Sequence, residues 1–146
     1  MMQKEVARRL VAKPGSADYG SISCFINYFT IPTLIYTVKR TSFYPSPDVD
    51  SCIVKLAFLE KPSVKVYDED KFFRIMRGSF NQRRKTIANS ISREAVLDIP
   101  KDELAEKLKS IGIDPASRPE TLSLTQFADI ANSNFLRKFD KPLGVW

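Results

Sequence analysis

The sequence changes character at residues 60–63, and this change limits the chain to folds with two differently built parts. Before it, β-branched and aromatic residues gather in short runs between proline- and glycine-containing segments, a pattern typical of strands. After it, apolar residues recur three and four positions apart, which is the spacing of one helix face. We therefore predict a strand-rich part over residues 1–61 and an all-helical part over residues 62–146. A chain of 146 residues has room for two small domains of this kind.

The first part contains one helix and three strand-like runs. The helix is predicted over residues 4–12, because Pro14 and Gly15 follow it. Strands are predicted over residues 22–29, 34–38 and 51–59. So few strands make a poor core, so we expect this part to be a fragment of a larger sheet. We also expect an uncovered apolar edge over residues 22–38, which favours self-association.

The second part reads as three helices. The first is long, over residues 68–92, with acidic residues in its first turn, where they suit the helix dipole. The second spans residues 101–110 and ends before Gly112, a residue type that favours the end of a helix. The third begins at Ser123, because Ser123 and Gln126 form a capping-box pattern.

Composition excludes several kinds of site. The chain has no histidine, which rules out Ser-His-Asp and Cys-His nucleophiles and histidine-ligated metals, so no metal is expected. Cys24 and Cys52 lie in apolar runs and are expected to be buried, reduced thiols, in keeping with a cytoplasmic protein. No apolar run reaches the length of a membrane-spanning helix. The net charge of +6 favours a polyanionic partner, either nucleic acid or an anionic membrane surface.

The long predicted helix carries the clearest electrostatic signal. From Lys71 to Arg93 it has seven basic residues and no acidic one, whereas ordinary exposed helices mix both charges. On a continuous helix, four of the basic residues share an arc of about 100° with Asn81. The arc is either a solvated face or a stripe that holds phosphates, and Arg83, toward the apolar side, reads as a buried structural partner. The four residues of the stripe are Arg74, Arg77, Arg84 and Lys85.

A second candidate site is the segment SFYPSPDVDS at residues 42–51. Its two prolines fix φ and remove two backbone donors, which predicts a stiff, extended loop rather than a strand. A stiff loop loses little entropy when it holds a side chain in place. Phe43 and Tyr44 are therefore either packed within the loop or presented as a platform on which a nucleobase stacks.

Five motifs, taken in order, resemble the ribosomal RNA adenine N6,N6-dimethyltransferases over nearly the whole chain. They are MxQKEVAxRL at residues 1–10, KPGxxxYGxxS at 13–23, FxPxPxVDSxxxxL at 43–56, FNQRRKT at 80–86 and GIDPxxRPExLSxxxF at 112–127. The Erm-type large-subunit rRNA methylases share the FxPxP element but fit the last two motifs less well. The sequence departs from the family pattern at Asp48, where lysine is usual, at Asn27, where glutamine is usual, and at Lys39-Arg40, where a proline is frequent.

The resemblance implies an S-adenosylmethionine-dependent enzyme that dimethylates N6 of two adjacent adenines in small-subunit rRNA. Its partner would be that rRNA or a 30S-type ribosomal precursor, and no membrane. It also implies a Rossmann-like α/β sheet followed by a small all-α domain, of which this chain would carry the C-terminal strands and the helical RNA-recognition domain. The family's glycine-rich cofactor loop and Asn-Leu-Pro-Tyr catalytic element do not occur here. Cofactor binding and a complete catalytic site are thus not expected in this chain, which alone would be inactive.

The resemblance also suggests roles for the candidate residues. An adenine must leave the base stack before its N6 can be methylated, and Phe43 matches the family residue that stacks on the flipped adenine. Arg74, Arg77, Arg84 and Lys85 would then contact rRNA phosphates. Two alternatives stay open, namely an RNA-binding or ribosome-assembly module without catalysis and an Erm-type methylase.

Overall fold

The chain folds as two compact units, Met1–Ser63 and Val64–Trp146. The structure, a computed structural model, describes residues 1–82, 84–93 and 100–133. The division between the units lies beside the change of composition at residues 60–63. Within the described residues, no helix is both long enough and apolar enough to cross a membrane.

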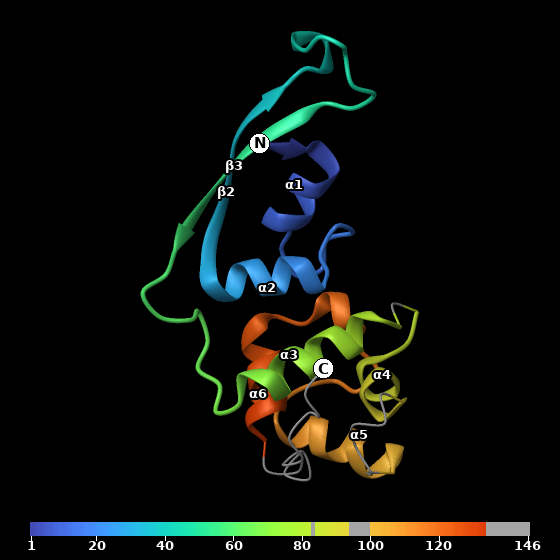
Figure 1. Cartoon of the computed structure of the whole chain (residues 1–146). Helices are drawn as coiled ribbons and strands as arrows, with labels where there is room; N and C mark the ends of the chain where they lie inside the picture. Colours follow the sequence, from blue (N-terminus) through green and yellow to red (C-terminus); the bar gives the residue numbers. More distant parts are fainter. Residues whose placement is uncertain (83, 94–99, 134–146) are drawn as a thin grey trace, which may run out of the picture. The chain divides into compact units, whose positions relative to one another are not determined.

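The first unit is built on a three-stranded sheet in which every described pairing is antiparallel (Figure 1). The strands, in the order β1-β3-β2 across the sheet, are β1 (Met2–Gln3), β3 (Ser51–Phe58) and β2 (Thr30–Val38). β2 and β3 form a long hairpin, and β1 pairs only with the start of β3. The predicted strand at residues 51–59 is confirmed, and that at 34–38 is longer than expected.

Two helices, α1 (Lys4–Val11) and α2 (Ser21–Phe29), lie on the same side of this hairpin (Figure 1). α1 contacts α2 and both long strands, while α2 contacts β2. The buried apolar side chains between these elements are Ala7, Leu10, Tyr19, Cys24, Tyr28 and Cys52. The core of this unit therefore lies between one face of the sheet and the two helices.

The prediction of a strand over residues 22–29 is wrong, because this segment is the helix α2. The hydroxyl of Ser23 donates to the carbonyl of Arg9 at 2.5 Å and accepts from the backbone N–H of Gly20 at 3.1 Å. The amide of Asn27 donates to the carbonyl of Leu10 at 3.4 Å. The bonds to the carbonyls of Arg9 and Leu10 dock α2 on α1, and burial of one helical face outweighs the β propensity of its residues.

The apolar edge predicted over residues 22–38 is therefore confined to β2. β2 contains Pro32, which has no N–H to donate, and its pairing with β3 shifts register between Leu34 and Tyr36. Both features hinder the pairing of a further strand at this edge. Apolar side chains nevertheless stay exposed on the hairpin. They are Ile31, Leu34, Ile35, Tyr36, Ile53 and Phe58.

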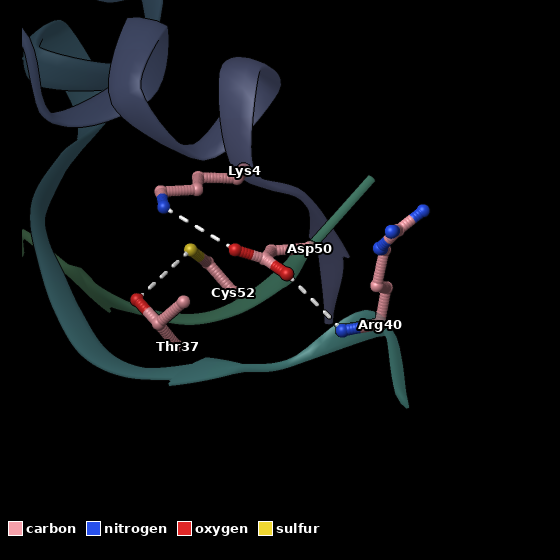
Figure 2. Close-up of polar contacts among 5 residues, drawn as sticks. All are labelled: Lys4, Thr37, Arg40, Asp50 and Cys52. Atoms are coloured by element: carbon pink, nitrogen blue, oxygen red, sulfur yellow. Dashed lines mark hydrogen bonds and ion pairs between the residues drawn. The ribbon is translucent and has the colours of Figure 1, made fainter. Parts of the chain in front are cut away.

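Both cysteines are buried and free, as predicted. The thiol of Cys24 donates to the hydroxyl of Tyr19 at 3.0 Å. Burial raises the pKa of the Cys24 thiol to about 11, against the opposing effect of this hydrogen bond. Cys52 lies 3.5 Å from the Thr37 hydroxyl across the hairpin (Figure 2). Cys24 is thus a packing residue and an unreactive thiol at neutral pH.

The second unit is helical in its described residues. Its helices are α3 (Glu69–Phe80), α4 (Ile87–Arg93), α5 (Lys101–Ser110) and α6 (Leu124–Asn132), with a short 3-10 turn, η2 (Pro119–Thr121). Their fully buried side chains include Phe72, Met76, Ile87, Leu104, Leu108, Leu122, Phe127 and Ile130. The predicted helix ends are confirmed where a residue next to the end determines it. Gly112 has φ of +77° after α5, and the Ser123–Gln126 capping box starts α6.

The single long helix predicted over residues 68–92 is wrong, because α3 ends at Phe80 and a separate helix, α4, begins at Ile87. The N–H of Ile87 donates to the carbonyl of Ser117 at 2.7 Å, and that of Ala88 to Pro115 at 3.4 Å. The Thr86 hydroxyl accepts from the N–H of Asn89 at 3.4 Å. The first amides of α4 are thus satisfied by a distant loop and a cap, so α4 starts as a new helix.

Candidate nucleic-acid interface

The loop between β2 and β3, residues 39–50, carries the aromatic pair. It opens with a 3-10 turn over Arg40–Ser42, after which Phe43 is extended at φ −120° and ψ 152°. The N–H of Phe43 and the hydroxyl of Ser46 donate to the carbonyl of Arg40, at 3.3 and 3.0 Å. Of the loop predicted to be extended over residues 42–51, Phe43 is extended, whereas the first residue, Ser42, ends the 3-10 turn. The turn, rather than the prolines alone, positions Phe43.

Phe43 and Tyr44 differ in exposure. Phe43 is half-buried, whereas Tyr44 is fully exposed at 101% of its reference area. A half-buried ring is held on one side by the protein and still has surface for a ligand. The stacking role of Phe43 stays a prediction.

Asp50 ties the loop to the start of α1 (Figure 2). One carboxylate oxygen accepts from the backbone N–H of Arg40 at 3.1 Å, and the other lies 3.4 Å from the ammonium of Lys4. Its carbonyl accepts from the N–H of Lys4 at 3.0 Å. The hydrogen bond from the Arg40 N–H is the main cause that holds the pKa of the Asp50 carboxyl below its usual value. Burial opposes it, and Lys4 adds a smaller lowering effect. The Val-Asp-Ser step therefore fixes both ends of the loop.

A cleft of about 560 Å³ opens beside this tie. Its walls come from the start of α1, from Asp18 in the α1–α2 loop, and from the β2–β3 loop. Most of its lining is charged, and Val49 is its one apolar side chain. The charged residues are Lys4, Glu5, Arg8, Asp18, Arg40, Asp48 and Asp50.

The predicted basic stripe is not a stripe on one helix. Arg74 and Arg77 lie on α3, whereas Arg84 and Lys85 lie in the turn after it. The shared arc assumed a continuous helix, so that geometric argument is wrong. Arg84, Lys85 and Arg77 are exposed, and the guanidinium of Arg77 also donates to the carbonyl of Phe73 at 3.4 Å. Arg74 is half-buried.

Two other basic residues of the same segment are not assigned to the exposed basic surface. Lys71 is buried at 9% exposure. Arg83 lies outside the described residues. The exposed pair Arg84 and Lys85 is therefore the part of the predicted site best placed to meet a polyanion.

Sequence reasoning missed the charged cleft. Its cations come from separate segments, Lys4 and Arg8 from one face of α1 and Arg40 from the hairpin loop. The one sequence signal for the cleft was the tripeptide Val-Asp-Ser, which places Asp50 at the end of the loop. A pattern search along the chain does not join residues that distant pairing brings together.

The described residues do not fit S-adenosylmethionine. Among them, no glycine-rich turn joins a strand to a helix, and Gly15 and Gly20 lie between the two helices α1 and α2. The cleft offers only Val49 as apolar surface for an adenine ring. In the same part of the chain, no group of three His, Cys, Asp or Glu residues is placed to hold a metal ion. What this site can do is bind and orient a charged ligand.

The sequence matches the family described as ribosomal RNA adenine dimethylase over residues 1–135. The chain belongs to this family, as the sequence motifs predicted.

Its relatives carry a more particular name. The protein named ribosomal RNA small subunit methyltransferase A from Bacillus cytotoxicus is 52% identical over 135 residues, which are 91% of this chain and 46% of that protein. The protein of the same name from Pelotomaculum thermopropionicum is 50% identical, over 91% of this chain and 45% of that protein. The chain thus spans about half the length of the curated relatives it matches.

Two solved structures share the fold of this chain, and the first of them agrees with the family assignment. A dimethyladenosine transferase from Plasmodium falciparum superposes with a TM-score of 0.69 at 26% identity, over 86% of this chain and 52% of that one. The 23S rRNA methyltransferase ErmE superposes at 0.58 with 19% identity, over 95% of this chain and 52% of its own, and shows a shared fold alone.

Proposed function

We propose that this chain is the C-terminal part of a cytoplasmic rRNA adenine dimethyltransferase, which transfers methyl groups from S-adenosylmethionine to N6 of two adjacent adenines in small-subunit rRNA. The chain supplies RNA binding and one wall of the adenine pocket. Residues 1–61 complete the methyltransferase sheet, and residues 62–146 recognise RNA. Cofactor binding and the catalytic asparagine belong to the other half of the enzyme.

One observation carries the proposal, namely close similarity to proteins named small-subunit rRNA methyltransferases. Two local features support it. The tie at Asp50 fixes the loop that holds Phe43 half-buried, as a wall for a flipped base requires. Arg84 and Lys85 are exposed between α3 and α4, in keeping with phosphate binding.

A chimaera tests this function. We join residues 1–146 behind the part of the Bacillus cytotoxicus relative that does not match this chain. Because the relatives are 52% identical over the matched part, the halves should pack and methylate small-subunit rRNA. Nucleoside mass spectrometry should detect N6,N6-dimethyladenosine, and large-subunit rRNA should stay unmodified.

The negative outcomes separate the alternatives. A chimaera that binds the cofactor but methylates neither rRNA would contradict the proposed reaction. If the 146-residue chain still bound rRNA, a non-catalytic RNA-binding module would be the better description. Methylation of large-subunit rRNA instead would identify an Erm-type enzyme.

The isolated chain also self-associates in this proposal. The support is the exposed apolar surface on the hairpin, where Tyr36 is 63% and Phe58 81% exposed. Sedimentation velocity should show a mass that rises with concentration, and the double variant Ile31→Lys, Tyr36→Lys should sediment as a monomer. A monomer at all concentrations for the unmodified chain would disprove this part.

A further inference from the structure

In the charged cleft beside the β2–β3 loop, some charged side chains have an ion-pair partner within the protein and others have none among the described residues. Lys4 pairs with Asp50, and Glu5 pairs with Arg9 at 2.6 Å. The side chains of Arg8, Arg40, Asp18 and Asp48 are exposed and make no hydrogen bond or ion pair with another described residue. Figure 2 shows the guanidinium of Arg40 turned away from Asp50. The cleft therefore presents two guanidinium groups and two carboxylates to a ligand.

A ligand that satisfies both kinds of group must be anionic at one end and rich in N–H donors at the other. A nucleotide has this character, because guanidinium groups bind phosphate and carboxylates accept hydrogen bonds from base amino groups. A simple anion would be repelled by Asp48 and Asp18, and a simple cation by Arg8 and Arg40. The mixed lining thus favours a nucleotide over either.

We infer that this cleft binds an RNA nucleotide next to the adenine that meets Phe43, with its phosphate on Arg8 and Arg40 and an amino group of its base on Asp48. This rests on the proposed function, since Arg40, Asp48 and Phe43 share one loop. Asp48 is therefore a specificity-determining residue. It favours bases that carry an amino group over uracil, which carries none.

Two short oligonucleotides of equal length, oligocytidylate and oligouridylate, make a matched pair of probes. The bases have the same shape. At position 4 cytosine carries an amino group and uracil a carbonyl, and at N3 cytosine is an acceptor and uracil an N–H donor, so the pair tests whether Asp48 contacts the group at position 4. In fluorescence anisotropy with the 146-residue chain, we expect tighter binding of oligocytidylate by about five-fold, the low end of a good base contact. Asp48→Asn should abolish or reverse this preference, because an amide can donate to the uracil carbonyl, and Asp48→Glu should keep it.

The phosphate contacts give a different signature. Arg8→Ala and Arg40→Ala should weaken both oligonucleotides equally and lower the salt slope by about 0.7 each, the value for a single-stranded phosphate. Asp129→Asn and Lys55→Ala are matched controls, since both residues are exposed and lie outside the cleft. Neither control should alter the preference or the slope.

The results distinguish this inference from the proposed function. If Asp48→Asn keeps the preference while Arg84→Glu with Lys85→Glu weakens rRNA binding, the cleft assignment is wrong and the function stands. If the chain binds neither oligonucleotides nor rRNA, both fail. A basic peptide that shifts the amide resonances of Arg40 and Asp48, where RNA shifts neither, would overturn the choice of ligand.

Discussion

Replacing Arg84 and Lys85 together with glutamate lowers the affinity of the chain for small-subunit rRNA roughly twenty-five-fold at ~0.1 M salt. Each phosphate contact on single-stranded RNA contributes about 0.7 to the slope of log affinity against log salt, so each is worth about 0.7 log unit at this concentration. Two lost contacts give about 1.4 log units, and the new negative charges add repulsion. Filter binding across a salt series measures both the affinity and the slope.

The two substitutions should not disturb the fold, because both side chains are exposed in the turn after α3 and make no hydrogen bond or ion pair with another described residue. The matched control is Lys101→Glu with Lys109→Glu, which makes the same charge change on exposed positions of α5. Circular dichroism should show both variants folded. Equal loss in the two double variants would mean that net charge acts without a localised site, and no loss in either would remove the phosphate contacts.

Replacing Phe43 with alanine lowers methyl transfer by the active chimaera roughly ten- to a hundred-fold. The reason is that stacking of a base on an aromatic ring is worth about 1–3 kcal/mol, which this variant loses. Cofactor affinity should not change, because the described residues do not fit the cofactor. The melting temperature should change little, since Phe43 is only half-buried. Initial rates with small-subunit rRNA provide the measurement.

Two matched variants test whether the loss of activity is specific to the flat ring at position 43. Tyr44→Ala removes the fully exposed neighbour of Phe43 in the same loop and should leave the rate within about two-fold, well below the loss of a stacked base. Phe43→Tyr keeps a flat ring and should retain activity. If Phe43→Ala melts the unit and Phe43→Leu is fully active, the ring is a packing residue and the stacking proposal is wrong.

The sequence alone determined the elements whose signals are local. The helix at Lys4–Val11 ends before Pro14 and Gly15, α5 ends before Gly112, and α6 begins at its own capping box. In each case neighbouring residues supply the partners that stop or start a helix. The family motifs were also readable in order, and they predicted the family that the comparisons establish.

Only the tertiary structure decided the rest, because the deciding partners are distant in sequence. Residues 22–29 form a helix because Ser23 and Asn27 bond to carbonyls of α1. The helix after residue 68 is broken because the first amides of α4 bond to residues 115–117. The charged cleft exists because Asp50 joins the end of a hairpin loop to the start of α1. Periodicity and propensity depend only on a residue's neighbours along the chain, whereas these hydrogen bonds form only once distant segments have packed.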